Sequence, residues 1–195
     1  MVVSTVTGTT PTTIPTSARA VCLIRSNKSN RAGTQPVSGP KSNSMRINKS
    51  VFCEILASFP SVPPECGGIL GQKNGIICAY LHDRKWQSTE SAIYVPDVDW
   101  MNRCIQEWAF TGIEFAGIVH SHPLDCNTLS EADRAYICQI MTAMPAHIME
   151  LFFPILIPGE DMYAYSATRS SGNVTIKPVP ITFIKPKCTN SILSK

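Results

Sequence analysis

The sequence predicts an α+β domain in which a mixed, largely antiparallel sheet is flanked by helices. Helical and strand-like patterns follow one another in the order helix, hairpin, helix, strand, helix, strands, without the regular strand–helix repeat of a parallel α/β protein. The Asn74-Gly75 pair between two short apolar runs is typical of a tight hairpin turn, which joins antiparallel strands. The 195 residues suffice for one sizeable core and a tail, and they contain no internal repeat.

The first half of the domain begins with a helix. Val51, Ile55 and Phe59 share one helical face, and Pro60 ends the pattern. Gly112 follows a second helical pattern in the same way, as a C-terminal stop. The elements predicted here are a helix at 48–59, strands at 68–72 and 76–81, a strand at 92–95 and a helix at 97–110.

The second half combines a strand, a helix and further strands. Residues 115–119 are a brief apolar run with β-branched residues toward its end, which favours a buried strand. Residues 130–141 repeat apolar residues at helical spacing, and Ser130 followed three residues later by an acid is a helix-start signal. Prolines within the remaining segments indicate edge or interrupted strands. These closing strands are predicted at 148–157, 162–168 and 174–184.

The two ends of the chain differ in composition from the domain between them. Residues 1–44 are rich in Thr, Ser, Pro, Gly and Asn, and such segments bury too little apolar area to offset chain entropy. We predict a disordered or weakly ordered tail there, a domain over residues 45–185 and a C-terminal tail over 186–195. Within the first tail, Val21–Ile24 form an apolar island that could dock as an edge strand or bind a partner.

Charge and hydropathy exclude several classes of function. Charged residues make up only 16% of the chain and the net charge is +3 without a dense Lys/Arg block, so no nucleic-acid partner is expected. No run of 18 apolar residues would span a membrane, and no membrane partner is expected. The N-terminus lacks the basic start and apolar core of a secretory signal, so we expect a cytoplasmic protein.

The eight cysteines do not form a recognisable framework. Their spacing is irregular and none belongs to a CxxC motif, so we predict no disulfides. Four of them occupy apolar-periodic positions and are predicted to be buried thiols: Cys53, Cys78, Cys104 and Cys138.

The segment from His120 to Asp133 carries a candidate metal site. If the strand before it continues through His122, the period of 2 directs His120 and His122 to the same face. Seven residues then lead to Ser130, which starts a helix with Asp133 in its first turn. Two imidazoles and one carboxylate leave the fourth tetrahedral position of zinc open for water, as in a catalytic site.

Each part of this pattern has a simpler explanation when taken alone. Ser130 and Asp133 alone indicate a capping box, and two histidines at alternate positions are often an ordinary strand-end pair. Glu65, which follows two prolines and precedes a Gly-Gly pair, would alone be a surface loop residue. Their conjunction favours a metal-dependent hydrolase in which Glu65 is the general base.

Taken together, Glu65, His120-Ser-His122-Pro and Ser130-Glu-Ala-Asp133 resemble the signature of the JAMM (MPN+) zinc metallopeptidase family, in its prokaryotic-type form. The resemblance covers roughly residues 47 to 170 and implies a JAMM/MPN-like fold. It implies that His120, His122 and Asp133 bind Zn²⁺ and that Glu65 is hydrogen-bonded to the metal-activated water. It further implies that Ser130 helps to stabilise the tetrahedral intermediate.

The resemblance also implies a substrate class. We expect a zinc-dependent isopeptidase or peptidase that cleaves at the C-terminal tail of ubiquitin or a ubiquitin-like protein. One alternative is the processing of a sulfur-carrier or ubiquitin-like precursor in a bacterial pathway, and another is a non-catalytic MPN scaffold. A third is a structural zinc protein, which would need a fourth protein ligand such as Cys126. The oligomeric state does not follow from the sequence.

Two cysteines and two histidines near these motifs have competing interpretations. Cys66 adjoins Glu65 and could act as a nucleophile, but a buried thiol is the simpler interpretation. Cys126 is a possible soft zinc ligand, although three ligands are already present without it. His82 and His147 belong to no motif, and we expect both to be structural or surface residues.

Overall fold

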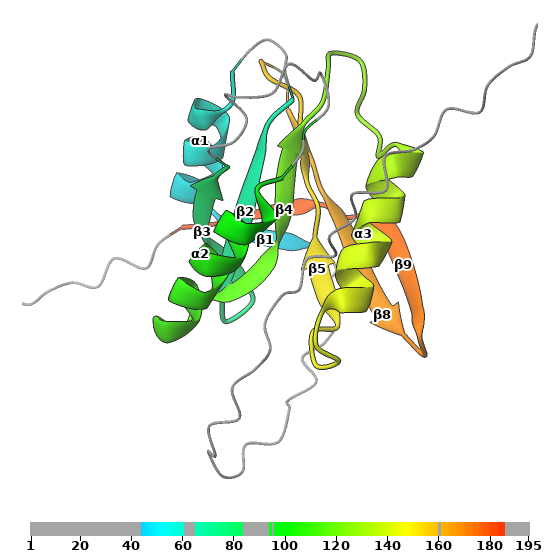
Figure 1. The fold of residues 1–195 in the computed structure, drawn as a ribbon. Coiled ribbons are helices and arrows are strands. Elements are labelled where there is room, and N and C mark those ends of the chain that lie inside the picture. The colour runs from blue at the N-terminus through cyan, green and yellow to red at the C-terminus, as the bar shows by residue number, and fades with distance from the viewer. Residues whose placement is uncertain (1–43, 61–64, 84–93, 95, 160, 186–195) are drawn as a thin grey trace, which may run out of the picture.

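The computed structural model describes residues 44–60, 65–83, 94, 96–159 and 161–185. In this part of the chain, ten strands form one sheet and three helices cover it (Figure 1). The helices are α1 (Lys49–Ser58), α2 (Val98–Phe110) and α3 (Glu131–Ala143). The strands are β1 (Met45–Asn48), β2 (Gly67–Lys73), β3 (Ile76–His82), β4 (Glu114–Ser121), β5 (Glu150–Phe152), β6 (Ile155–Leu156), β7 (Met162–Tyr163), β8 (Tyr165–Ser170), β9 (Asn173–Pro178) and β10 (Ile181–Ile184).

The sheet is mixed, with strand order β10-β1-β3-β2-β4-β5-β8-β9. β2 pairs antiparallel with both β3 and β4, and the β5–β8, β6–β7 and β8–β9 pairs are antiparallel as well. Parallel pairs join β1 to β3 and β10, and β4 to β5 and β6. The prediction of an α+β fold with a mixed, largely antiparallel sheet flanked by helices is therefore confirmed.

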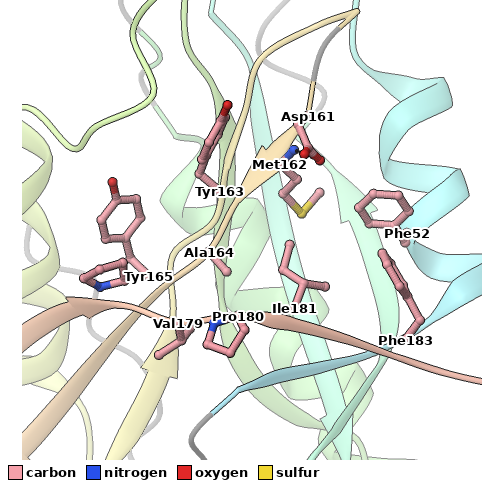
Figure 2. A pocket seen from close by; sticks show the side chains of 11 residues that line it. Phe52, Asp161, Met162, Tyr163, Ala164, Tyr165, Val179, Pro180, Ile181 and Phe183 are labelled. Atoms are coloured by element: carbon pink, nitrogen blue, oxygen red, sulfur yellow. Dashed lines mark hydrogen bonds between the residues drawn. The ribbon is translucent and has the colours of Figure 1, made fainter.

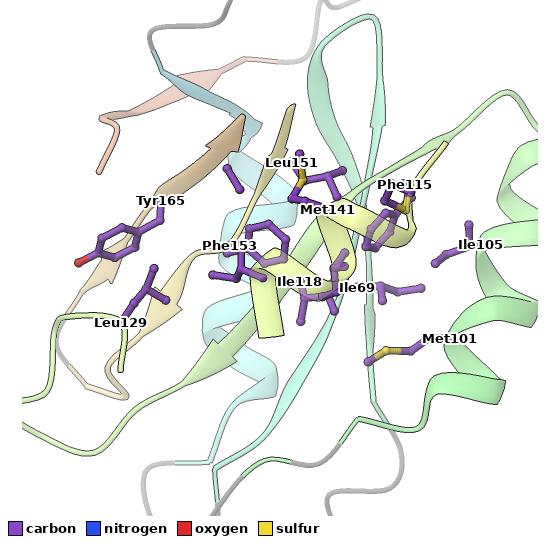
Figure 3. Packing of buried hydrophobic residues seen from close by; sticks show 14 of the residues in the cluster. Ile69, Met101, Ile105, Phe115, Ile118, Leu129, Met141, Leu151, Phe153 and Tyr165 are labelled. Atoms are coloured by element: carbon purple, nitrogen blue, oxygen red, sulfur yellow. The ribbon is translucent and has the colours of Figure 1, made fainter. Parts of the chain in front are cut away.

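The helices divide between the two faces of the sheet. Side chains of α2 and α3 pack on one face against Ile69 of β2 and Ile118 of β4, in the cluster that Figure 3 shows. The next residues along the same strands, Leu70 and Val119, join the opposite cluster, which contains buried side chains of α1. Because side chains alternate along a strand, β2 and β4 contribute apolar residues to both cores. This arrangement makes β4 a central strand, buried on both sides.

Local sequence signals account for the turns and the helix ends. Asn74 and Gly75 both have positive φ, 55° and 70°, as a two-residue type I′ hairpin turn requires. α2 begins where the side chain of Asp97 accepts the Trp100 N–H at 3.1 Å. It ends at Phe110, followed by Gly112 with a φ of 72°.

The structure corrects the predicted elements at several places. The helix predicted at 48–59 is α1, but strand β1 precedes it and was not predicted. The strand predicted at 148–157 is divided into β5 and β6, because Pro154 lacks the N–H that a continuous ladder needs. The segment predicted at 162–168 is divided at Ala164 into β7 and β8, and the segment predicted at 174–184 is divided near Pro178 and Pro180 into β9 and β10.

Three predictions lie outside the described residues. They are the N-terminal tail up to residue 43 with its Val21–Ile24 island, nearly all of the strand at 92–95, and the C-terminal tail at 186–195. Within the described ranges, none of the helices has both the length and the apolar character needed to cross a bilayer.

Candidate metal centre

The two histidines lie at the C-terminal end of the central strand β4. The His120 N–H bonds to the Pro154 carbonyl at 3.2 Å, and the His122 N–H bonds to the Leu156 carbonyl at 2.9 Å. β4 extends past the predicted run of 115–119 to Ser121, and the hydrogen bond of His122 continues the pairing with β6 by one more residue. Both imidazoles therefore project from the same face, and their Nε2 atoms are 2.8 Å apart.

The third member of the group comes from the start of α3. Asp133 lies in the first turn of that helix, with Oδ1 at 3.4 Å from His120 Nε2 and Oδ2 at 3.3 Å from His122 Nε2. The candidate ligand atoms of these three residues all lie within 4.8 Å of one another. His122 is the most enclosed, with a side chain 5% exposed, and the Asp133 side chain is 23% exposed. The group could hold a metal ion that solvent can still reach.

A hydrogen bond orients the His122 ring. Its Nδ1 atom lies 2.9 Å from the carbonyl oxygen of Cys126. A carbonyl can only accept, so Nδ1 carries a proton, and Nε2 is the nitrogen that the neutral ring would offer to a metal. Zinc-binding histidines are commonly fixed by this kind of hydrogen bond, which selects the tautomer that ligates through the other nitrogen.

Ser130 and Asp133 form a complete capping box. The Ser130 hydroxyl accepts the Asp133 N–H at 3.1 Å, and the Ser130 N–H donates to Asp133 Oδ2 at 2.8 Å. The same hydroxyl donates to Oδ2 at 2.7 Å. The capping interpretation of this pair thus describes its geometry, and the role of Ser130 toward an oxyanion stays a prediction. Asp133 serves the helix start and the candidate metal group with one carboxylate.

The electrostatics of the group favour a charged carboxylate beside the imidazoles. Burial alone would raise the pKa of Asp133, but hydrogen bonds from His120, His122 and Ser130 hold that pKa far below its ordinary value. Burial lowers the pKa of His122, yet its bonds to Asp133 and to the Cys126 carbonyl outweigh burial and raise the pKa. Asp133 is therefore anionic at neutral pH, as a metal ligand must be.

Glu65 lies beside the group through the pairing of β2 with β4. Gly67 is opposite His120, and the Ser121 N–H bonds to the Cys66 carbonyl at 2.8 Å. Continuing this register places Glu65 opposite His122, and directly opposed residues share a face. The Glu65 carboxylate contributes to the raised pKa of His122, so its charge acts on this ring. Its Oε2 atom accepts the backbone N–H of Tyr94 at 3.4 Å.

The two neighbouring cysteines do not match the alternative roles considered for them. Cys66 is buried on the opposite face of the sheet, and burial raises the pKa of its thiol to about 11, which suppresses a nucleophilic thiolate. Cys126 is exposed, and among the described residues the metal-ligand group contains only His120, His122 and Asp133. All six described cysteines are free thiols.

The ligand set fits zinc in chemistry and in two of its three spacings. Ligands at 2.0–2.1 Å from a tetrahedral zinc lie roughly 3.3 Å from one another. The distances from Asp133 to the two imidazoles are close to this value, whereas the two Nε2 atoms at 2.8 Å are closer than it. A small rotation of either ring would open that distance. The oriented Nδ1–H of His122 satisfies the outer hydrogen bond that such a site needs.

Two further residues next to Glu65 were not identified from the sequence. Tyr94 packs its ring against Gly67, whose added Cβ would lie 2.6 Å from Tyr94 Cζ. The Tyr94 hydroxyl donates to Asp83 Oδ2 at 2.9 Å, and Asp83 is fully buried. The Gly-Gly pair after Glu65 was the available signal, because glycine in a strand often marks the close approach of another group.

The molecule also contains an apolar cavity that is separate from this group. It has a volume of about 350 Å³ and lies between α1, β7 and β10 (Figure 2). Phe52, Met162, Ile181 and Phe183 are among its lining residues, and Asp161 is the one charged residue of the described lining. None of the candidate metal ligands lines it.

Comparison with known proteins gives similarity of fold alone. No family model matches the sequence, and no curated protein matches it. A solution structure of a protein from Desulfitobacterium hafniense is 16% identical, covers 72% of this chain and 93% of its own, and superposes with a TM-score of 0.52. A JAB1/MPN domain protein from Archaeoglobus fulgidus is 18% identical over 72% of this chain and 100% of its own, with a TM-score of 0.39. A protein from Salinibacter ruber is 16% identical over 74% of this chain and 94% of its own, with a TM-score of 0.43.

Proposed function

We propose that this protein is a zinc-dependent peptidase or isopeptidase of the JAMM type. The observation that carries the proposal is the convergence of His120, His122 and Asp133 within 4.8 Å, with Glu65 just before the neighbouring strand β2. These are the residues that the sequence motif assigns to metal binding and to the general base. A hydrolase needs both functions within reach of one scissile carbonyl.

Zinc is the metal that we propose for the group. Two imidazole nitrogens and one carboxylate are a donor set typical of catalytic zinc, which keeps a fourth position for water. When bound, zinc would polarise the scissile carbonyl and make water acidic enough to attack at neutral pH. His120, His122 and Asp133 would hold it.

The protein's own residues would carry the proton transfers. Glu65 would accept a proton from the attacking water and return it to the departing amine, so no covalent bond to the enzyme forms. Ser130 would donate its hydroxyl to the developing oxyanion. That hydroxyl donates to Asp133 Oδ2 at 2.7 Å in the structure, so it would have to rotate away from the carboxylate during the reaction.

The substrate class rests on the sequence resemblance. We propose cleavage at the C-terminal tail of ubiquitin or a ubiquitin-like protein, with a cytoplasmic location. Cleavage of a sulfur-carrier precursor would require the same chemistry, and the two alternatives differ only in the substrate protein. A metal-free scaffold is disfavoured by the His122 ring, which is oriented toward His120 and Asp133 in an arrangement that a scaffold would have no use for.

The test combines a substrate panel with a variant of the base. Purified protein is incubated with fusions and conjugates of ubiquitin-like proteins, with and without a metal chelator, and cleavage is followed by mass. We expect cleavage after the C-terminal residue of a modifier, and we expect the chelator to stop it. In Glu65→Gln, cleavage should fall by about a hundredfold or more because the base is lost, while elemental analysis should still give about one zinc per chain.

Glu54→Gln is a matched control, because Glu54 is an exposed carboxylate on α1, away from the metal group. It should leave both cleavage and zinc content unchanged. Retained cleavage in Glu65→Gln would remove the base from the proposal, and loss of zinc would make Glu65 a ligand instead. Cys126→Ser with unchanged zinc affinity would exclude a closed structural site that uses this thiol.

A further inference from the structure

A buried carboxylate lies at the end of β3, two strands away from β4. Asp83 is 0% exposed, and its Oδ2 atom accepts both the Tyr94 hydroxyl at 2.9 Å and the Asp97 N–H at 2.8 Å. Asp97 caps the start of α2. One buried oxygen therefore bonds to both Tyr94 and Asp97. Buried carboxylates are costly unless hydrogen bonds compensate for the lost solvent, so this position is specified strongly.

Asp83 and the metal group lie in one row across the sheet. The Asp83 N–H bonds to the Gly67 carbonyl at 2.8 Å, which extends the pairing of β3 with β2, and Gly67 pairs with His120 on β4. Asp83, Gly67 and His120 thus share a face. Gly67 has no side chain, and the Tyr94 ring occupies the space above it between the other two residues.

Tyr94 also reaches Glu65 through its main chain. The Tyr94 N–H donates to Glu65 Oε2 at 3.4 Å, at the long end of the hydrogen-bond range. Such bonds are often long before substrate binds and shorten in the reacting complex. The ring of Tyr94 is anchored on Asp83 while its amide holds the carboxylate opposite His122.

We propose that Asp83 and Tyr94 are positioning residues that hold the Glu65 carboxylate in its catalytic orientation, an inference that rests on the proposed function of Glu65 as the general base. Neither residue touches the scissile bond. Asp83 fixes the Tyr94 ring, the ring fixes the Tyr94 amide, and the amide fixes one oxygen of Glu65. The other oxygen is left to accept the proton from water.

Fixing the orientation of the Glu65 carboxylate would make proton transfer more frequent. A glutamate side chain has several rotatable bonds, and a base that samples many orientations is rarely in line with the proton that it must accept. Burial and the charge of Asp83 keep the pKa of the Tyr94 phenol well above its ordinary value, so the hydroxyl stays a donor at working pH. The hydrogen bond from the Tyr94 hydroxyl to Asp83 is therefore not lost by deprotonation of the phenol.

The test uses Tyr94→Phe, which removes only the anchoring hydroxyl and keeps the ring on Gly67. We expect kcat to fall by about tenfold, with KM and zinc content unchanged, because alignment is lost and binding is not. Asp83→Asn keeps an oxygen that can accept both bonds, so it should stay within about twofold of the unmodified protein. Asp83→Ala is less informative because it leaves buried donors unsatisfied and endangers folding.

Tyr136→Phe is the matched control. Tyr136 is a partly buried tyrosine on α3, and its hydroxyl has no hydrogen-bond partner among the residues that the structure describes. The charge of Asp83 acts on it as well, since burial first and Asp83 second raise its pKa to about 12. Removing this hydroxyl should leave kcat unchanged. Equal kcat values in Tyr94→Phe and Tyr136→Phe would overturn the proposal.

Amide hydrogen exchange at residue 94 separates this proposal from the proposed function. In the zinc-loaded protein we expect the amide at position 94 to exchange several-fold faster in both Tyr94→Phe and Glu65→Ala, because Glu65→Ala removes the acceptor of this amide. The measurement needs no turnover, so it decides the matter even if no tested substrate is cleaved. An amide at 94 that does not respond to Glu65→Ala would overturn the proposal, as would a loss of zinc in Tyr94→Phe.

Discussion

The metal group at the end of β4 and the cavity beside β10 differ in their linings. At the metal group three candidate ligand atoms converge, and each residue is held by further hydrogen bonds or ion pairs. The cavity has a volume of about 350 Å³, but its described lining is mostly apolar, and its single carboxylate, Asp161, accepts the neighbouring Met162 N–H. Among the described residues, the converging ligand atoms therefore lie outside this cavity.

The difference shows what should decide the assignment of a site. Ligand sites are often sought as the largest hollow, but catalytic chemistry needs polar groups that converge and whose protonation states are controlled. Among the described residues, the region around β4 is where three possible metal-ligating side chains converge. The cavity is better understood as packing space between α1 and the edge strand β10, where Phe52 and Phe183 meet edge-to-face at 4.8 Å.

The largest expected effect concerns metal affinity. His122→Ala and Asp133→Asn each remove one ligand, and we expect the affinity for zinc to fall by more than about a hundredfold. Asp161→Asn in the cavity wall is the matched control and should leave the affinity unchanged. A competition titration against a chromophoric chelator measures all three. Equal losses in Asp161→Asn and Asp133→Asn would remove the distinction between the two regions.

A smaller effect is expected from one substitution in each region, measured both as stability and as zinc affinity. Ser130→Ala removes a helix cap and Phe183→Ala removes a half-exposed aromatic contact, so each should lower the free energy of unfolding by about 1 kcal/mol. Only Ser130→Ala should also weaken zinc binding, because its hydroxyl donates to Asp133. Urea unfolding of the metal-free proteins and zinc titration provide the two measurements. Weaker zinc binding in Phe183→Ala would show that the regions are coupled.

The smallest effect is a pH dependence of stability that changes sign with the metal. The pKa of His122 is raised in the folded protein, so its proton stabilises the metal-free fold below the ordinary value of 6.5, and this stabilisation is lost as pH rises through the raised pKa. Zinc requires the neutral imidazole, so its stabilisation grows over the same range. Thermal midpoints with and without zinc should therefore change in opposite directions. His147→Ala, at an exposed position, should show the same pH dependence of the thermal midpoint as the unmodified protein. Loss of that pH dependence in His147→Ala would refute the assignment of the titration to His122.

The sequence predicted what depends on local signals. The turn at Asn74-Gly75 and the cap at Ser130 are specified by residues whose neighbours in sequence are also their partners in space. The candidate ligands were predictable for the same reason, since His120 and His122 lie on one strand and Asp133 follows at the start of the next helix.

The sequence did not predict what depends on distant partners. β1 is only four residues long and is a strand because it pairs in parallel with β10, which lies more than 130 residues further along the chain. Tyr94 and Asp83 are joined to Glu65 by the pairing of β2 with β3, and no spacing rule connects the three positions. Long-range contacts of this kind are set by packing, which a single sequence does not display.

The capping box that Asp133 completes has a consequence for how this lineage could diverge. A substitution at Asp133 removes a candidate metal ligand and also removes the capping box at the start of α3. It would therefore reduce both metal affinity and the stability of the fold. A substitution at His120 removes a ligand without touching a helix start. We therefore expect homologues that have abandoned metal binding to have replaced a histidine first and to have kept the serine and the aspartate.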